Sequence, residues 1–231
     1  MDFIKRYFGA DFPRAVLFDL DGTLVDSAPD LAVAMDTVLT RLALPVVGEE
    51  RVRGWVGNGA KKLVHRALAF AVGQAEHQIS DRRVDSTLAL FLEEYRQTNG
   101  CYSHLYPGVV DALKVWRSHR VPMAVVTNKL VEFVPTLLSG LDIDYYFVAL
   151  VGGACTSQKK PSALPLLHAC EVLNVPPETC LMIGDSCNDV QAARAAKMPV
   201  AAVNYGYNHG EPIAGSHPDI VVGSIFDLVR R

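Results

Sequence analysis

The sequence has little cysteine and no paired arrangement of it. Its five cysteines among 231 residues form no CxxC motif, which predicts reduced, mostly buried thiols and argues against a disulfide framework. The seven histidines show no HExxH or comparable spacing, so a zinc site is not indicated. No apolar run approaches the roughly 18 residues that a membrane-spanning helix requires.

An excess of one charge is also missing. The 22 Lys and Arg residues against 25 Asp and Glu give a net charge of -3, and the basic residues are scattered. A nucleic-acid-binding protein would need a basic stripe. The pair Lys5-Arg6 is not followed by a long apolar stretch, so we expect no signal peptide. These absences predict a cytoplasmic protein without membrane or nucleic-acid partners. The sequence leaves open whether it is a monomer or a homodimer.

What is present is a regular alternation of two patterns. Half of the residues are hydrophobic and a fifth are charged, as in an ordinary folded protein. Short apolar runs alternate with helical periodicity, which predicts an α/β fold: a Rossmann-like parallel sheet with helices on both faces. The predicted strands are residues 15–18, 123–126, 146–151, 180–183, 200–203 and 220–222. The predicted helices between them are residues 109–117, 130–138, 163–173 and 189–196.

One long segment interrupts this alternation. Residues 27–103 contain no convincing strand, but three apolar stripes at helical spacing, and Ser27-Ala-Pro-Asp30 is typical of a capped helix start. An insert after the first strand would lie above the carboxyl ends of the sheet, where open α/β sheets bind ligands. We therefore predict a core of residues 1–26 and 104–231 and a helical cap of residues 27–103.

The first predicted strand ends in acids. Asp19-Leu20-Asp21-Gly22-Thr23 follows a buried run directly, where an unpartnered carboxylate would be costly. Exposed loops also carry paired acids for solubility, but a divalent cation would explain acids at a hydrophobic strand end.

Two further strand ends carry polar groups that are weak signals by themselves. Thr127-Asn128-Lys129 offers a hydroxyl, an amide and backbone N–H groups at an expected strand-to-helix turn, an anion cradle or simply a helix cap. Lys159-Lys160-Pro161 precedes a helix, and the ammonium of Lys160 either reaches inward to an anion or lies in solvent.

The fourth run ends in Gly184-Asp185-Ser186-Cys187-Asn188-Asp189. Asp189 could be a helix cap, but two acidic strand ends in one chain point to a site. Parallel strands place these ends on one side of the sheet. Because carboxylates repel phosphate and hard oxygen ligands favour Mg²⁺ over zinc, the pattern predicts a magnesium site for a phosphorylated substrate.

In this order, DxDGT, the strand-terminal threonine, Lys-Pro and GDSxND resemble the haloacid dehalogenase-like superfamily over essentially the whole chain. The residues Gly54-Trp55-Val56-Gly57-Asn58-Gly59-Ala60 of the cap and the late Tyr205-Gly206-Tyr207-Asn208 are similar to those of bacterial phosphoglycolate phosphatases. The resemblance implies hydrolysis of a small phosphorylated organic acid, 2-phosphoglycolate, to glycolate and phosphate.

The resemblance also implies residue roles. Asp19 would form an aspartyl-phosphate, and Asp21 would act as general acid and base. Thr127, Asn128 and Lys160 would bind phosphoryl oxygens. Mg²⁺ would be held by Asp19, the main-chain carbonyl of Asp21 and Asp185, with Asp189 in a supporting position.

The cap carries a separate hypothesis. Gly57-Asn58-Gly59 allows close backbone approach to a ligand, and we expect this loop with Lys61 or Lys62 to contact the substrate carboxylate; the alternative is a flexible hinge or helix start. Other substrates remain open for this fold: pyrophosphate, a sugar phosphate or a nucleotide. A dehalogenase is disfavoured by the extra acid Asp21, and a catalytically inactive binding scaffold by the intact acids.

Overall fold

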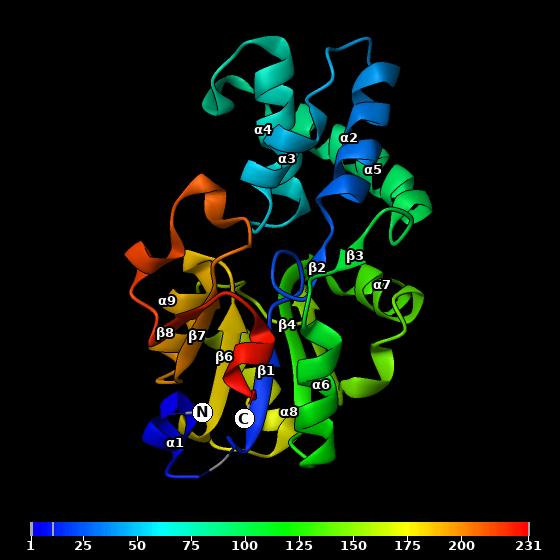
Figure 1. The fold of residues 1–231 in the computed structure, drawn as a ribbon. Helices are drawn as coiled ribbons and strands as arrows, with labels where there is room; N and C mark the ends of the chain where they lie inside the picture. Colours follow the sequence, from blue (N-terminus) through cyan, green and yellow to red (C-terminus); the bar gives the residue numbers. More distant parts are fainter. Residues whose placement is uncertain (1, 11, 231) are drawn as a thin grey trace.

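A single parallel sheet forms the centre of the computed structural model, which describes residues 2–10 and 12–230. The strand order is β5-β4-β1-β6-β7-β8, and all neighbours run parallel. β1 therefore lies in the middle, with β4 and β6 beside it (Figure 1). The strands are β1 (Ala15–Phe18), β4 (Met123–Leu130), β5 (Ala149–Gly153), β6 (Cys180–Gly184), β7 (Val200–Val203) and β8 (Ile220–Val222).

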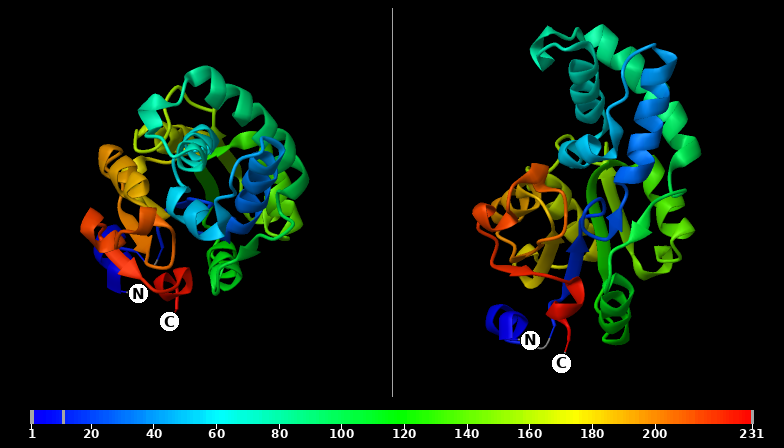
Figure 2. Two further views of the ribbon diagram at one scale, coloured as in Figure 1. Left: turned by 90° about the horizontal axis from the view of Figure 1, so that it is seen from above. Right: turned by 45° about the horizontal axis from the view of Figure 1, so that its top comes forward.

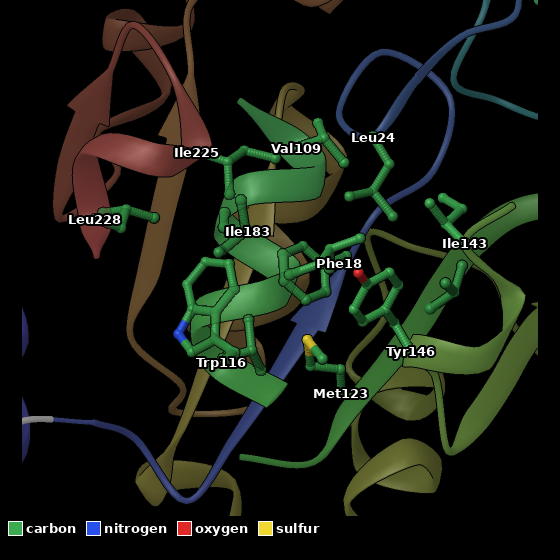
Figure 3. Packing of buried hydrophobic residues seen from close by; sticks show 14 of the residues in the cluster. Phe18, Leu24, Val109, Trp116, Met123, Ile143, Tyr146, Ile183, Ile225 and Leu228 are labelled. Atoms are coloured by element: carbon green, nitrogen blue, oxygen red, sulfur yellow. The ribbon is translucent and has the colours of Figure 1, made fainter. Parts of the chain in front are cut away.

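Alternate side chains of β1 pack into two different layers, as the two-residue period of a strand requires. Val16 and Phe18 join the core under α6 and α7, whereas Ala15 and Leu17 join the core under α8 and α9. Figure 3 shows Phe18 between Trp116 of α6 and Tyr146; the Phe18 and Trp116 rings meet edge to face at 5.3 Å. The helices of this part are α1 (Asp2–Phe8), α6 (Val109–Ser118), α7 (Val134–Gly140), α8 (Leu164–Leu173) and α9 (Cys187–Ala195).

Four helices form the region that we call the cap. They lie over the carboxyl edge of the sheet (Figures 1 and 2) and pack around an apolar cluster that Phe133 and Tyr207 of the core join. This agrees with the predicted helical insert; its limits at residues 27 and 103 stay a proposal. Among the described residues, no helix is both long and apolar enough to cross a bilayer. The cap helices are α2 (Ala28–Arg41), α3 (Gly48–Trp55), α4 (Ala60–Val72) and α5 (Asp81–Thr98).

The chain enters and leaves the cap through two short antiparallel strands, β2 (Val25–Asp26) and β3 (His104–Leu105). Asp30, in the first turn of α2, is fully buried at this junction and accepts hydrogen bonds from the N–H groups of Gly100 and Tyr102 and from the hydroxyl of Ser103. Its carboxylate therefore ties the start of α2 to the segment that follows α5.

The predicted cap of α2 is wrong in its detail. The helix does begin after Ser27, but the side chain of Ser27 makes no capping bond; its hydroxyl donates instead to Asp21 at 2.6 Å. The N–H groups of Ser27 and Ala28 donate to the hydroxyl of Tyr207, each at 3.0 Å. A tyrosine from the far end of the chain therefore replaces the local cap.

Three other sequence predictions need correction. β4 continues to Leu130, through an irregularity after Val126, so no strand-to-helix turn follows Val126. β5 begins at Ala149, because residues 144–146 form a single 3₁₀ turn rather than the strand start predicted at residue 146. The cysteines are free, but Cys101 and Cys155 are exposed, contrary to the expected burial.

Candidate active site

The acids at two neighbouring strand ends lie together. Asp19 follows β1 and Asp185 follows β6, and the N–H of Asp19 donates to the carbonyl of Ile183 at 2.9 Å, which extends the pairing of the two strands. The carboxylates of Asp19, Asp185 and Asp189 are all buried, and one oxygen from each lies within 4.8 Å of the others. The structure thus brings together three of the predicted metal-site residues.

Burial and neighbouring carboxylates raise the pKa values of two acids in this cluster. Burial, followed by the neighbouring carboxylates, raises the pKa of Asp185 to about 8. Burial also raises the pKa of Asp19 to about 7, although Lys160 opposes that shift. Buried carboxylates this close favour protonation unless a cation offsets their charge.

Lys160 supplies only part of that compensation. Its ammonium lies 2.8 Å from Oδ1 of Asp19 and 2.7 Å from Oδ1 of Asp189, and it donates to the carbonyl of Val126. Burial lowers the pKa of Lys160, but Asp189 and Asp19 raise it by more, so the lysine stays charged. One ammonium offsets the charge of only one of three carboxylates, so the remaining negative charge suits a divalent cation.

Asp189 has both roles that the sequence left open. Its Oδ2 accepts from the N–H groups of Asp185 and Ser186 and from the hydroxyl of Ser186 at 2.8–3.2 Å, which caps α9. Its Oδ1 accepts from Lys160. Asp189 therefore holds the turn that carries Asp185 while it orients the lysine, and its supporting position at Mg²⁺ stays a prediction.

Close backbone packing fixes Asp185. Its Oδ1 accepts from the hydroxyl of Thr23 and its Oδ2 from the N–H of Tyr207, each at 2.8 Å. A Cβ added to Gly22 or to Gly206 would overlap the Asp185 side chain. The two glycines thus bring the backbone directly against the carboxylate on which a metal would depend.

Thr127 and Asn128 lie inside β4, at the edge of a pocket between core and cap. The side chain of Asn128 donates to the carbonyls of Gly57 and Lys160 and accepts from the N–H of Lys160. Asn128 therefore fixes the backbone of the buried lysine and links it to the cap loop.

The loop Gly57-Asn58-Gly59 lies against the core, whereas the lysines after it do not. The carbonyl of Gly57 accepts from Asn128, the side chain of Asn58 accepts from Asn188 at 2.8 Å, and both glycines line the pocket. Lys61 is paired with Asp85 at 2.7 Å and Lys62 with Glu76 at 2.5 Å, and neither lines the pocket.

Sequence reasoning missed Lys129 as a side chain of this site. Its buried ammonium donates to Oδ1 of Asp21 at 3.0 Å and shares a 2.6 Å hydrogen bond with the Tyr95 hydroxyl. Burial lowers the pKa of Lys129, but Asp21 and Tyr95 raise it by more. The only available signal was the position of Lys129 beside Thr127-Asn128, which we interpreted as a backbone cradle.

The rest of the pocket is mainly apolar. Asp19 and Asp21 form its floor together with the end of β4, and the cap closes over it. Its apolar lining residues are Leu31, Val56, Ala60, Leu63, Phe91, Leu92, Leu130 and Phe133.

A parallel sheet with buried aspartates at its carboxyl edge, covered by an inserted helical cap, defines a class of hydrolase. Residues 13–197 match the family of haloacid dehalogenase-like hydrolases, and the chain belongs to that family.

Within the family, the chain is similar to curated phosphoglycolate phosphatases. It is 44% identical over 230 residues to phosphoglycolate phosphatase 1 of Pseudomonas aeruginosa, covering 99% of this chain and 83% of that protein. It is 43% identical to the phosphoglycolate phosphatase of Escherichia coli, covering 94% and 91%. The crystal structure of a predicted phosphoglycolate phosphatase from Haemophilus somnus superimposes with a TM-score of 0.89 at 35% identity, covering 96% of this chain and 98% of that one.

Proposed function

We propose that this chain is a magnesium-dependent phosphatase that hydrolyses 2-phosphoglycolate to glycolate and phosphate. The observation that carries the proposal is the position of Asp19 and Asp21 on the floor of a small, capped pocket, with Asp185, Asp189 and Lys160 beside Asp19. The similarity to phosphoglycolate phosphatases over nearly the whole chain supports this substrate.

The residues present suit a hard divalent cation. Three buried carboxylates share a site, and among the described residues the partner of Oδ1 of Asp19 is the single ammonium of Lys160 at 2.8 Å. We propose that Asp19, the main-chain carbonyl of Asp21 and Asp185 hold Mg²⁺, with Asp189 in support. Bound there, Mg²⁺ would offset the charge of the carboxylates and of the incoming phosphate.

In the first half of the reaction, a carboxylate oxygen of Asp19 attacks phosphorus and the bond between phosphorus and the ester oxygen breaks. Asp21 gives its proton to the leaving oxygen, so glycolate departs with a hydroxyl group. In the second half, a water oxygen attacks phosphorus and the water gives a proton to Asp21. Phosphate leaves and Asp19 is regenerated.

The charge that develops on the transferred group needs donors placed in advance. We propose that Lys160, the Thr127 hydroxyl and Asn128 supply them. Lys160 lies beside Asp19, and Thr127 and Asn128 line the pocket next to it. We also propose that the backbone of Gly57-Asn58-Gly59 contacts the substrate when the cap is closed, since Gly57 and Gly59 line the pocket.

The lining of the pocket favours a small leaving group over the alternatives. A sugar or a nucleotide brings many hydroxyl and amide groups, and burying them against leucine, valine and phenylalanine side chains without partners is unfavourable. A two-carbon acid presents one methylene and one carboxylate. Glycolate therefore needs one charged partner in this pocket, whereas a sugar needs several polar partners.

A panel of phosphate monoesters tests the proposal. We expect phosphate release from 2-phosphoglycolate with Mg²⁺, at a kcat/KM well above those for pyrophosphate, a sugar phosphate and a nucleotide. A chelator and the Asp19→Asn substitution should each abolish release. Equal rates across the panel would exclude the substrate but keep the phosphatase, whereas absence of release from every ester would indicate an inactive scaffold.

A further inference from the structure

Lys129 is the one basic side chain that lines the pocket, counting only the residues that the structure describes. Its ammonium has three N–H donors. The described partners of these donors are Oδ1 of Asp21 at 3.0 Å, Oδ2 of Asp21 at 3.4 Å and the hydroxyl of Tyr95 at 2.6 Å. The long contact to Oδ2 is the one that an anion in the pocket would replace, and Lys129 is held in place by contacts to both the core and the cap.

The position of Lys129 relative to Asp21 defines how far its ligand lies from the chemistry. Under the proposed mechanism, Asp21 contacts the leaving oxygen of the ester, and the ammonium of Lys129 is 3.0 Å from Asp21 Oδ1. The leaving oxygen and the Lys129 ammonium would thus contact the same carboxylate, that of Asp21. In 2-phosphoglycolate the carboxylate carbon is only two bonds from that oxygen, so a substrate whose leaving oxygen contacts Asp21 keeps its carboxylate close to the groups bound to Asp21.

Three cations of the cap are paired with carboxylates, and the ammonium of Lys159, which lies against Gly59, is outside the pocket lining. Lys61 and Lys62 pair with Asp85 and Glu76, and the guanidinium of Arg53 pairs with Asp26 at 2.7 Å. None of these three lines the pocket. Lys160 lies between Asp19 and Asp189, where its proposed role is to bind the phosphoryl group, and it does not line the pocket.

From this geometry, and on the basis of the proposed phosphatase function, we propose that Lys129 binds the carboxylate of the substrate and thereby selects short, anionic phosphate monoesters. Tyr95 is a positioning residue, because its hydroxyl holds the ammonium over the pocket while its ring stacks on Phe91 at 5.6 Å between centroids. Longer acids would place the carboxylate beyond the ammonium and against the apolar cap residues.

The test compares 2-phosphoglycolate with its amide, which has the same shape but no negative charge on the leaving group. In the unsubstituted enzyme we expect kcat/KM to favour the acid by about 10- to 100-fold, the range of a charge-assisted hydrogen bond in a buried site. Lys129→Gln should bring this ratio close to one, mainly by lowering kcat/KM for the acid. Lys129→Arg should keep most of the preference.

The ratio of the two esters separates recognition from chemistry, because loss of a contact to Asp21 would affect both esters alike. Lys114, exposed on α6 and outside the pocket lining, provides the matched control: Lys114→Gln should leave the ratio unchanged. A full preference for the acid in Lys129→Gln would overturn the proposal. If that variant is inactive on both esters, their binding to it decides: an affinity that still favours the acid over the amide as strongly as in the unsubstituted enzyme would overturn the proposal.

The result also distinguishes this inference from the function on which it rests. If the unsubstituted enzyme shows no activity on 2-phosphoglycolate in the ester panel, the proposed function fails. If it hydrolyses 2-phosphoglycolate well and Lys129→Gln retains the preference for the acid, only the role of Lys129 fails.

Discussion

The junction between core and cap depends on one buried carboxylate, and replacing it gives a sharp prediction. Asp30 accepts three hydrogen bonds on two oxygens: Tyr102 donates to Oδ1, and Gly100 and Ser103 donate to Oδ2. Asp30→Asn keeps the shape but exchanges one acceptor oxygen for an NH₂ group. Whichever way the amide turns, its NH₂ faces a backbone N–H, either that of Tyr102 or that of Gly100.

The expected cost follows from this conflict. The Ser103 hydroxyl can reverse and accept, but a backbone N–H cannot, so one buried donor is left without a partner and one charge-assisted bond is lost. These two effects together predict a decrease of roughly 2–4 kcal/mol in the free energy of unfolding. Urea denaturation followed by tryptophan fluorescence measures it, since Trp116 lies in the core and Trp55 in the cap.

A matched control lies on the same helix. Asp36 is partly exposed and accepts from the N–H groups of Val47 and Gly48 within the cap. Because solvent can replace a lost partner there, Asp36→Asn should cost about 1 kcal/mol or less. A decrease for Asp30→Asn no larger than that of the control would refute the reasoning that the Asp30 carboxylate is indispensable at the junction.

Four further outcomes are expected. Asp21→Asn should lower kcat by about 10²- to 10⁴-fold in steady-state assays, because the leaving oxygen loses its proton donor. Gly206→Ala should weaken Mg²⁺ activation by about 10- to 100-fold in a metal titration, since the added Cβ would displace Asp185. Mg²⁺ should raise the midpoint of thermal unfolding by binding the native acids, and Asp185→Asn should remove this shift. Burial raises the pKa of Asp219, but the hydrogen bond from Arg194 and further donors lower this pKa overall. The stability that results is present above the usual carboxyl pKa and is lost as pH falls through the lowered pKa. The stability difference between Asp219→Asn and the unsubstituted protein should therefore shrink in denaturation curves below about pH 4.

Much of the fold follows from simple patterns in the sequence. The strand at residues 15–18 and the helices after it were predictable, because fully buried parallel strands are continuous apolar runs and their covering helices keep a period near 3.6. The end of β4 was not predictable in this way. Thr127, Asn128 and Lys129 are polar but buried, since the site supplies their partners, and a hydrophobicity pattern treats them as a turn.

The convergence of the acids was equally predictable, since parallel strands end at one edge and Asp19 and Asp185 each follow such a strand. What the sequence did not reveal is which distant side chains complete the site. Tyr207 reaches the start of α2 from about 180 residues away, and Tyr95 comes from the cap to hold Lys129. Such partners depend on how the cap rests on the core, which no local pattern encodes.

The expectation for the cap lysines could, however, have been tested against the sequence itself. A helix turns about 100° per residue, so Lys62 lies roughly 200° around α4 from Ala60. Ala60 lines the pocket, and Leu63 and Val64 lie within about 60° of it on the buried stripe. The same periodicity that predicted this stripe therefore places Lys62 on the opposite face, where it pairs with Glu76. Nearness in sequence to a glycine loop is a weaker guide to a ligand than the face of the helix on which a side chain lies.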